Sequence, residues 1–191
     1  MRKILVTLAC LGSIVLASPL AGAQSISEEA AASLAFMREE EKLAHDVYFL
    51  FDGLYGGVEP GSKVFAHIAD SETRHTEAIA ELLVKYGLED PAIDNEPGEF
   101  DDTDLQVLYD TLVAIGRSGY EEALGVGVLI ERKDMTDIVA AIDVCIAYPD
   151  IVQVYSNLLT ASEHHLDAFL KVLEKFPESG SKPNPSMRNA H

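Results

Sequence analysis

Four stretches of the chain repeat apolar residues every three to four positions, which is the spacing of an amphipathic helix. We predict helices over residues 27–52, 62–87, 119–147 and 150–176. Ser27 is a typical helix start, because a hydroxyl can cap the free amides there, and Gly87 is typical of the residue that ends a helix. No segment alternates with period two strongly enough to indicate a sheet. The pattern therefore predicts an all-α protein.

The links between these helices restrict how the helices pack. Residues 53–61 and 148–149 form short links, so the helices that each link joins should lie antiparallel and adjacent. The link over residues 88–118 is long and contains a predicted short helix from Thr103 to Arg117. The sequence therefore predicts a four-helix bundle with one long crossover that carries a short extra helix.

The charge of the chain narrows the classes of partner. With 32 acidic and 14 basic residues the formal net charge is −18, which repels phosphates and anionic lipid heads. We therefore expect neither nucleic acid nor a membrane surface as a partner. Two cysteines are too few for a disulfide scaffold or a cysteine-rich zinc site. Whether the chain forms a homo-oligomer stays open.

The first residues have the layout of a cleaved secretory signal. Arg2 and Lys3 precede an apolar run, and Ala21-Gly22-Ala23 supplies the small residues that favour cleavage. We predict three parts: a signal peptide over 1–23, a bundle domain over 24–176 and a disordered tail over 177–191. The mature protein is then expected to be periplasmic or extracellular.

All four predicted helices present an apolar seam to the bundle, and each seam becomes polar at mid-length. The polar seam residues are Glu41 on the first helix, Glu72 and His75 on the second, Glu131 and Asp134 on the third, and Ser162 and His165 on the fourth. Ionised carboxylates inside an apolar bundle are costly unless they are paired or bound to a metal, and few basic residues are available to pair with them.

Divalent cations would compensate these acids. Carboxylate oxygens and neutral imidazole nitrogens together suit iron, manganese or zinc. Glu72 and His75 are three residues apart on one helix face, so both can reach the same metal. The seams therefore predict a metal centre at the middle of the bundle.

Each signal also has an ordinary interpretation. A lone Glu-x-x-His match is frequent by chance and usually marks a solvated helix face. Glu41 stands in the charged run of residues 38–42, a pattern typical of an exposed face. Glu131 and Asp134 become surface acids if their helix is rotated by one position, and His165 can be a hydrogen-bonded core histidine. The matching depth of the polar residues on four seams favours the metal interpretation.

Three segments carry a resemblance to known proteins. They read MREEEKLAHDVY over residues 37–48, SETRH over 71–75 and SEHHLDAF over 162–169. Together they resemble the group described as domain of unknown function 2202, and the domain over 27–176 resembles the ferritin-like four-helix superfamily. The dinuclear site of that superfamily takes a Glu from each of two helices and Glu-x-x-His from the other two.

The resemblance implies roles for particular residues. Glu41 is implied as the ligand from the first helix, and Tyr48 as the tyrosine often found beside the metals. Glu72 and His75 are implied as ligands from the second helix, and Glu131 from the third.

The fourth helix departs from the superfamily pattern. It has Ser162-x-x-His165 where many members have Glu-x-x-His, so one carboxylate is missing. Asp134, three residues after Glu131, can replace it, with His165 as the second imidazole ligand. The departure leaves open whether the centre holds two metals or one.

Two hypotheses for function follow from the residues and the resemblance. The first is an exported di-iron carboxylate oxidase that oxidises ferrous iron or reduces oxygen or peroxide. Iron, two per chain, is the favoured cofactor, with manganese, zinc or copper as alternatives. Glu72 or Glu131 would bridge the metals, and Tyr48 would orient a carboxylate or supply an electron. The second hypothesis is a non-catalytic bundle that sequesters a metal or serves as an interaction scaffold.

Overall fold

The computed structural model describes residues 25–176, and in that range the chain forms five helices and no strands. The helices are α1 (Glu28–Tyr55), α2 (Val64–Tyr86), α3 (Thr103–Gly116), α4 (Tyr120–Val144) and α5 (Pro149–Leu173). The predicted all-α class is confirmed for this range. The predicted signal peptide over 1–23 and the predicted tail over 177–191 lie outside the described residues.

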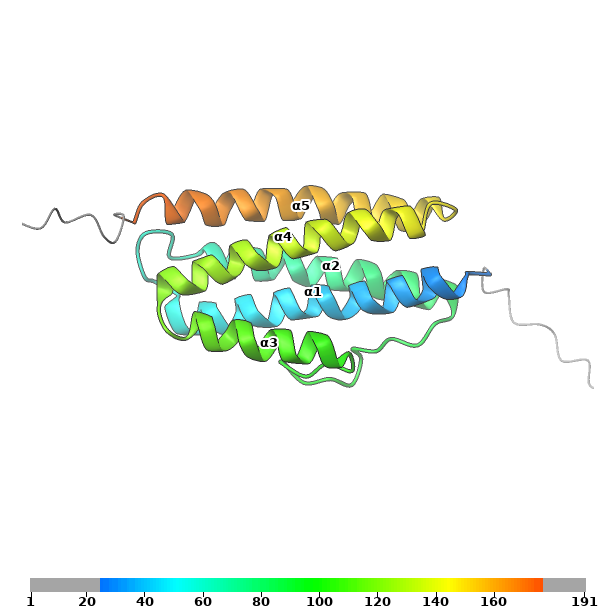
Figure 1. The fold of residues 1–191 in the computed structure, drawn as a ribbon, viewed down its shortest axis with the longest axis horizontal. Coiled ribbons are helices and arrows are strands. Elements are labelled where there is room, and N and C mark those ends of the chain that lie inside the picture. Colours follow the sequence, from blue (N-terminus) through cyan, green and yellow to red (C-terminus); the bar gives the residue numbers. More distant parts are fainter. Residues whose placement is uncertain (1–24, 177–191) are drawn as a thin grey trace, which may run out of the picture.

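The four long helices lie side by side, and the shorter α3 lies along the outside of α1 (Figure 1). The most extensive packing is between α1 and α2 and between α4 and α5, and both pairs run antiparallel, as their short links predict. Contacts of α1 with α4 and of α2 with α5 join the two pairs, and α3 packs on both α1 and α4. The crossover helix therefore covers one side of the bundle.

Helix ends follow the predicted signals in part. The Ser27 hydroxyl accepts a hydrogen bond from Ala30 N at 3.2 Å, and Gly87 ends α2 with a left-handed φ of 68°. The second helix begins at Val64, two residues after the predicted start, and the side chain of Lys63 before it caps no amide.

The other boundaries shift because of local contacts. The first helix continues beyond residue 52 to Tyr55, whose hydroxyl donates to the carbonyl oxygen of Gly116 at 2.7 Å. A turn separates α4 from α5, closed by Tyr148 N donating to Cys145 O at 2.8 Å, so α4 ends at Val144 before the predicted residue 147. Proline then stands in the first turn of α5, where it leaves no helical hydrogen bond unmade.

The apolar core consists of two clusters. One includes Phe51, Phe65 and Phe169, and the other includes Leu34 and Ile79 at the opposite end of the bundle. The polar seam residues occupy the level between these clusters. Hydrophobic burial at both ends thus fixes the four helices around a polar middle.

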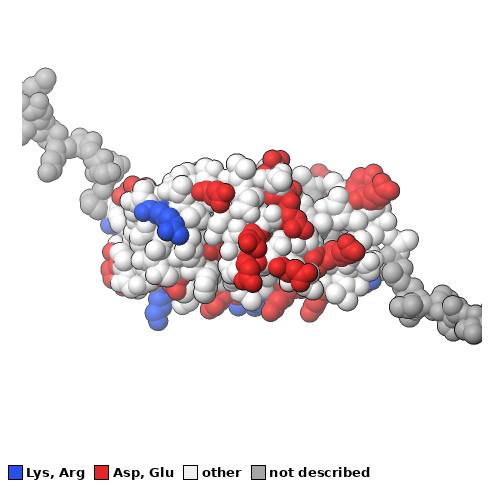
Figure 2. Space-filling model, turned by 90° about the horizontal axis from the view of Figure 1, so that it is seen from below, with Lys and Arg blue, Asp and Glu red and all other residues white. Residues whose placement is uncertain are grey.

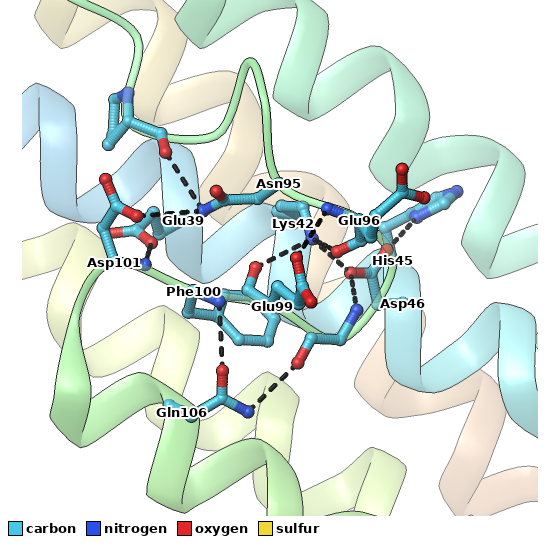
Figure 3. Close-up of polar contacts among 12 residues, drawn as sticks. Glu39, Lys42, His45, Asp46, Asn95, Glu96, Glu99, Phe100, Asp101 and Gln106 are labelled. Atoms are coloured by element: carbon cyan, nitrogen blue, oxygen red, sulfur yellow. Dashed lines mark hydrogen bonds and ion pairs between the residues drawn. The ribbon is translucent and has the colours of Figure 1, made fainter.

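Buried charges on α1 hold the crossover in place (Figure 3). Lys42 Nζ donates to Asp46 Oδ2 at 2.6 Å. It also donates to the carbonyl oxygens of Glu96 and Glu99, at 2.9 and 3.1 Å. Asp46 Oδ2 in turn accepts from Gly98 N at 2.8 Å. The backbone of the crossover therefore binds directly to an ion pair on α1.

A third buried side chain completes this contact. Glu39 Oε1 accepts from Asp101 N at 2.6 Å, and Glu39 Oε2 accepts from Asp102 N at 3.2 Å, immediately before α3 begins. We refer to Glu39, Lys42 and Asp46 as the crossover anchor. All three are at most 8% exposed.

The outer surface agrees with the acidic composition. Figure 2 shows the face on which α3 and the crossover lie, where acidic side chains outnumber basic ones. Exposed acids of this segment include Asp94, Glu96, Glu99, Asp101 and Asp104. None of the described helices is both long enough and apolar enough to cross a membrane.

Candidate metal centre

Four helices bring the predicted polar residues to one level inside the bundle. The residues are Glu41 of α1, Glu72 and His75 of α2, Glu131 and Asp134 of α4, and Ser162 and His165 of α5. Each is at most 8% exposed. Helical periodicity explains the placement, because these positions continue the apolar stripes that form the two core clusters. We call this set the central polar layer.

The first group of possible ligands contains Glu41, Glu72 and His75. His75 Nδ1 lies 2.6 Å from Glu72 Oε2 and 3.2 Å from Glu41 Oε2. The three ligand atoms all lie within 4.8 Å of one another. One cation can therefore contact both helices that form the first antiparallel pair.

The second group contains Glu72, Glu131 and His165. His165 Nδ1 lies 2.8 Å from Glu72 Oε1 and 3.6 Å from Glu131 Oε2. Glu72 thus presents one carboxylate oxygen to each imidazole and belongs to both groups. The two imidazole rings lie nearly parallel, with centroids 5.7 Å apart.

Asp134 lies in the same layer but outside both groups. Its Oδ2 is 2.5 Å from the hydroxyl of Ser162. The serine that departs from the superfamily pattern therefore contacts the acid that we predicted as a replacement ligand. The sequence predicts Ser162 on the seam without a role of its own. That seam position is the only feature of the sequence that points to its contact with Asp134.

Tyr48 is completely buried beside this layer. Its hydroxyl donates to Glu131 Oε1 at 2.6 Å, and its ring packs on Phe169 with centroids 5.2 Å apart. The contact leaves the second Glu131 oxygen facing His165. Tyr48 therefore orients this carboxylate, and its implied role beside bound metals stays a prediction.

Several polar atoms of the layer have no hydrogen-bond partner among the described residues. They are Glu41 Oε1, Asp134 Oδ1 and His165 Nδ1. His165 Nδ1 lies 2.8 Å from Glu72 Oε1 in an ion-pair contact. Buried groups of this kind are rare because each costs about 1–3 kcal/mol. Carboxylate oxygens together with imidazole nitrogens, once the imidazoles lose their protons, are a donor set that fits a transition metal.

The alternative interpretation, in which Glu41 belongs to an exposed charged face, is wrong. Residues 39–42 are all buried, because α2, α4 and the crossover cover different sides of α1. Glu40 pairs with Lys133 of α4, whereas Glu41 contacts His75 of α2. The alternative in which Glu131 and Asp134 are surface acids is likewise wrong, since they are 1% and 5% exposed.

Comparison with known proteins identifies the family. The family described as an uncharacterized protein domain, DUF2202, matches residues 30–185. The chain belongs to this family. The predicted resemblance to the DUF2202 group is therefore confirmed, whereas the wider resemblance to the ferritin-like superfamily stays a prediction.

A relative of this chain has been characterised in both sequence and crystal structure. The DUF2202 chain is 39% identical over 153 residues to the uncharacterized protein MJ0754 of Methanocaldococcus jannaschii, a match that covers 80% of each protein. A crystal structure of the hypothetical protein MJ0754 from Methanococcus jannaschii superposes with a TM-score of 0.72 over 82% of this chain and 86% of that chain. The fold is therefore shared with a solved structure at substantial sequence identity.

No lysine or arginine compensates the acids of the central polar layer in the described part of this DUF2202 chain. Among residues 25–176, no Lys or Arg forms an ion pair with Glu41, Glu72, Glu131 or Asp134. Burial, which removes water from the charged form, raises the pKa of Glu41 to about 8 and raises the pKa of Asp134.

The two imidazoles reverse the effect of burial on the pKa of Glu72. Burial opposes ionisation of Glu72, but His165 and His75 outweigh it and lower the pKa of Glu72 to about 2. Burial likewise opposes charge on the imidazoles, yet the facing carboxylates raise the pKa of His75 to about 10 and that of His165 to about 9. The facing carboxylates therefore favour the protonated form of both imidazoles, and a metal ligated by them would have to displace these protons.

Proposed function

We propose that this DUF2202 protein is an exported ferritin-like di-iron carboxylate oxidase, which oxidises ferrous iron or reduces oxygen or peroxide. The carrying observation is the position of Glu72, which presents Oε2 to His75 and Oε1 to His165 and so joins two groups of possible ligands. A carboxylate with one oxygen directed to each of two sites is suited to bridge two cations. Export rests on the signal layout of residues 1–23.

Charge balance supports two divalent cations. The four acids of the layer, Glu41, Glu72, Glu131 and Asp134, carry four negative charges when ionised, and neutral imidazoles add none. Two divalent ions would neutralise this charge, which an apolar bundle requires. The atoms without partners supply free lone pairs on α1, α4 and α5.

The residues have distinct roles in this proposal. His75 and Glu41 would hold one ion, His165 and Glu131 the other, and Glu72 would contact both. When bound, iron supplies one-electron chemistry with oxygen species, which no side chain of the layer can supply. Tyr48 keeps one Glu131 oxygen engaged, and Ser162 fixes the orientation of Asp134. The apolar clusters above and below the layer exclude bulk water.

Metal content and turnover test the proposal together. We expect about two irons per chain in protein reconstituted with ferrous iron, and oxidation of many ferrous ions per chain in air. Glu72→Gln should lose metal and turnover, because the amide removes the negative charge and one acceptor oxygen. Glu77→Gln, at an exposed position on the same helix, is the matched control and should behave as the wild type.

The outcomes separate the hypotheses. Uptake of two ions with a single oxidation event per site would support the metal-sequestering alternative. No metal uptake by the wild type, with an unchanged melting temperature in the presence of a chelator, would exclude both metal hypotheses and leave a scaffold.

A further inference from the structure

A cavity of 280 Å³ lies where α3 packs on the bundle, between α1, α3 and α4. Its apolar wall consists of Leu43, Leu108, Leu112, Ile115, Leu129 and Ile130. We call it the α3 cavity. Ile115 and Leu129 are 42% and 53% exposed, so large aliphatic side chains stand where the cavity meets solvent.

The polar residues that border the α3 cavity have partners within the chain. Glu40 Oε1 and Asp137 Oδ2 both accept from Lys133 Nζ at 2.5 Å. The Thr111 hydroxyl donates to the carbonyl oxygen of Val107 at 2.8 Å. Glu40 Oε2 has no partner, but the atom is itself buried and presents no surface to a molecule in the cavity.

These contacts determine the class of molecule that the cavity can hold. A water molecule inside a protein needs two to four polar partners, and the wall offers almost none. A charged ligand would lose its hydration without compensation, which is costly. Anions would also meet the acidic face that carries α3 (Figure 2). The favoured occupant is therefore uncharged and apolar.

The volume sets the size of the occupant. An apolar cavity of ~150 Å³ lined by aliphatic and aromatic side chains holds benzene. The α3 cavity has roughly twice that volume, which corresponds to an aromatic ring with a short aliphatic substituent, or about ten carbon atoms.

We propose that the α3 cavity is a binding site for a small uncharged hydrocarbon-like molecule, such as a substituted aromatic ring. The site borders α1 and α4 at the level of the central polar layer, since Glu40 and Ile130 each precede a residue of that layer. None of the residues that line the α3 cavity belongs to the two groups of possible metal ligands. Binding is therefore independent of the proposed function and occurs with or without metal.

Methyl NMR of the complete chain with toluene as the probe tests this site. Toluene should cause saturable shifts at the methyl groups of Leu112, Ile115 and Ile130. The methyl groups of Ile79 and Ile138, in the core cluster at the other end of the bundle, should not shift. Shifts should be the same in metal-free and metal-loaded protein.

Variants and a charged analogue complete the design. Ile115→Trp and Leu129→Trp place a large ring at the mouth and should each weaken toluene binding at least about tenfold, equivalent to about 1.4 kcal/mol. Val107→Trp, at an exposed α3 position outside the wall, is the control and should bind toluene as the wild type does. Benzoate should bind at least about tenfold more weakly than toluene, because its carboxylate cannot be desolvated.

Several results would overturn the proposal. These are the absence of saturable shifts, equal shifts in both core clusters, or unchanged toluene affinity in both mouth variants. Equal affinity for benzoate and toluene would contradict the apolar assignment. A failure of metal binding would leave all of these measurements unaffected.

Discussion

Two buried charged regions share helix α1 and differ in how completely the chain satisfies them. In the crossover anchor, Lys42 donates to three oxygen atoms and Asp46 and Glu39 accept backbone amides. In the central polar layer, Glu41 Oε1, Asp134 Oδ1 and His165 Nδ1 lack hydrogen-bond partners. On α1 the two regions lie on different faces, because Glu41 contacts His75 of α2 whereas Lys42 binds the crossover.

This difference separates charged residues that stabilise the fold from those of the candidate site. Backbone groups of the crossover compensate the anchor, so the anchor needs nothing from outside the chain to be stable. The central layer instead concentrates four acids around two imidazoles, and its free lone pairs fit an external cation. The buried polar atoms that lack a hydrogen-bond partner therefore mark this layer as the candidate site.

The largest effect is expected from breaking the anchor. Lys42→Met removes the ammonium while Asp46 stays buried, and we expect a loss of about 3–5 kcal/mol in the free energy of unfolding. Urea unfolding measures this loss. Lys171→Met is the control, because the Lys171 side chain is 72% exposed and its pair with Asp167 should contribute at most about 1 kcal/mol. Equal losses in the two variants would mean that the anchor does not hold the crossover.

Metal removal should have the next largest effect. Metal present at about 100 times the dissociation constant should stabilise the folded chain by about 2.7 kcal/mol per site, and a chelator should remove that gain. Thermal unfolding of metal-loaded protein before and after chelation measures the change. If chelation leaves the melting temperature unchanged, the central polar layer needs no external cation for stability. The proposed difference from the crossover anchor would then be contradicted.

Neutralising an acid should have opposite effects in the two regions. Burial raises the pKa of Asp134, so folding of the metal-free chain near neutral pH forces this carboxyl to take up a proton. Asp134→Asn removes that cost, and we expect it to stabilise the metal-free chain by about 1–3 kcal/mol while weakening metal binding. Asp46→Asn should destabilise the chain by a similar amount, since Lys42 then loses its counterion. Urea midpoints of both variants in chelator give the comparison. Destabilisation of the metal-free chain by Asp134→Asn would show that this carboxylate is structural.

The smallest effect is a difference in acid sensitivity. Burial opposes ionisation of Asp46, but hydrogen bonds from His45, Lys42 and the Gly98 amide outweigh it and lower the pKa of Asp46. A lowered folded-state pKa stabilises the chain above the unfolded value near ~4, and that gain is lost as the pH falls through the folded value. The urea midpoint should therefore fall more between pH 5 and pH 3 in the wild type than in Asp46→Asn. An equal fall in the two proteins would mean that these contacts do not lower the pKa of Asp46 in the folded chain.

Much of the fold was accessible from the sequence. The helix stretches, the long crossover and its short helix follow from apolar periodicity and from glycine and proline positions, which act locally. Boundaries shifted where tertiary contacts extended or shortened a helix, as at Tyr55, whose hydroxyl reaches Gly116. A hydrogen bond between residues 61 positions apart leaves no local signal.

The candidate site was accessible only in part. Glu41, Glu72, His75, Glu131 and His165 were predicted from their seam positions or from the resemblance, and the structure brings them into two adjoining groups. Their assignment as metal ligands stays a prediction. The contact between Ser162 and Asp134 and the position of Asp134 outside both groups depend on side-chain orientation, which spacing along a helix does not specify.

By itself the sequence determined that polar residues occur at one depth on four helices, because the helical period places seam residues at regular heights whatever packs against them. Only the tertiary structure decided what each charged residue meets. Successive residues on a helix point about 100° apart, so Glu39, Glu40 and Glu41 face the crossover, α4 and α2 respectively. Adjacent residues of one charged run are for this reason assigned to an anchor, a partly buried ion pair with Lys133 and the candidate metal centre.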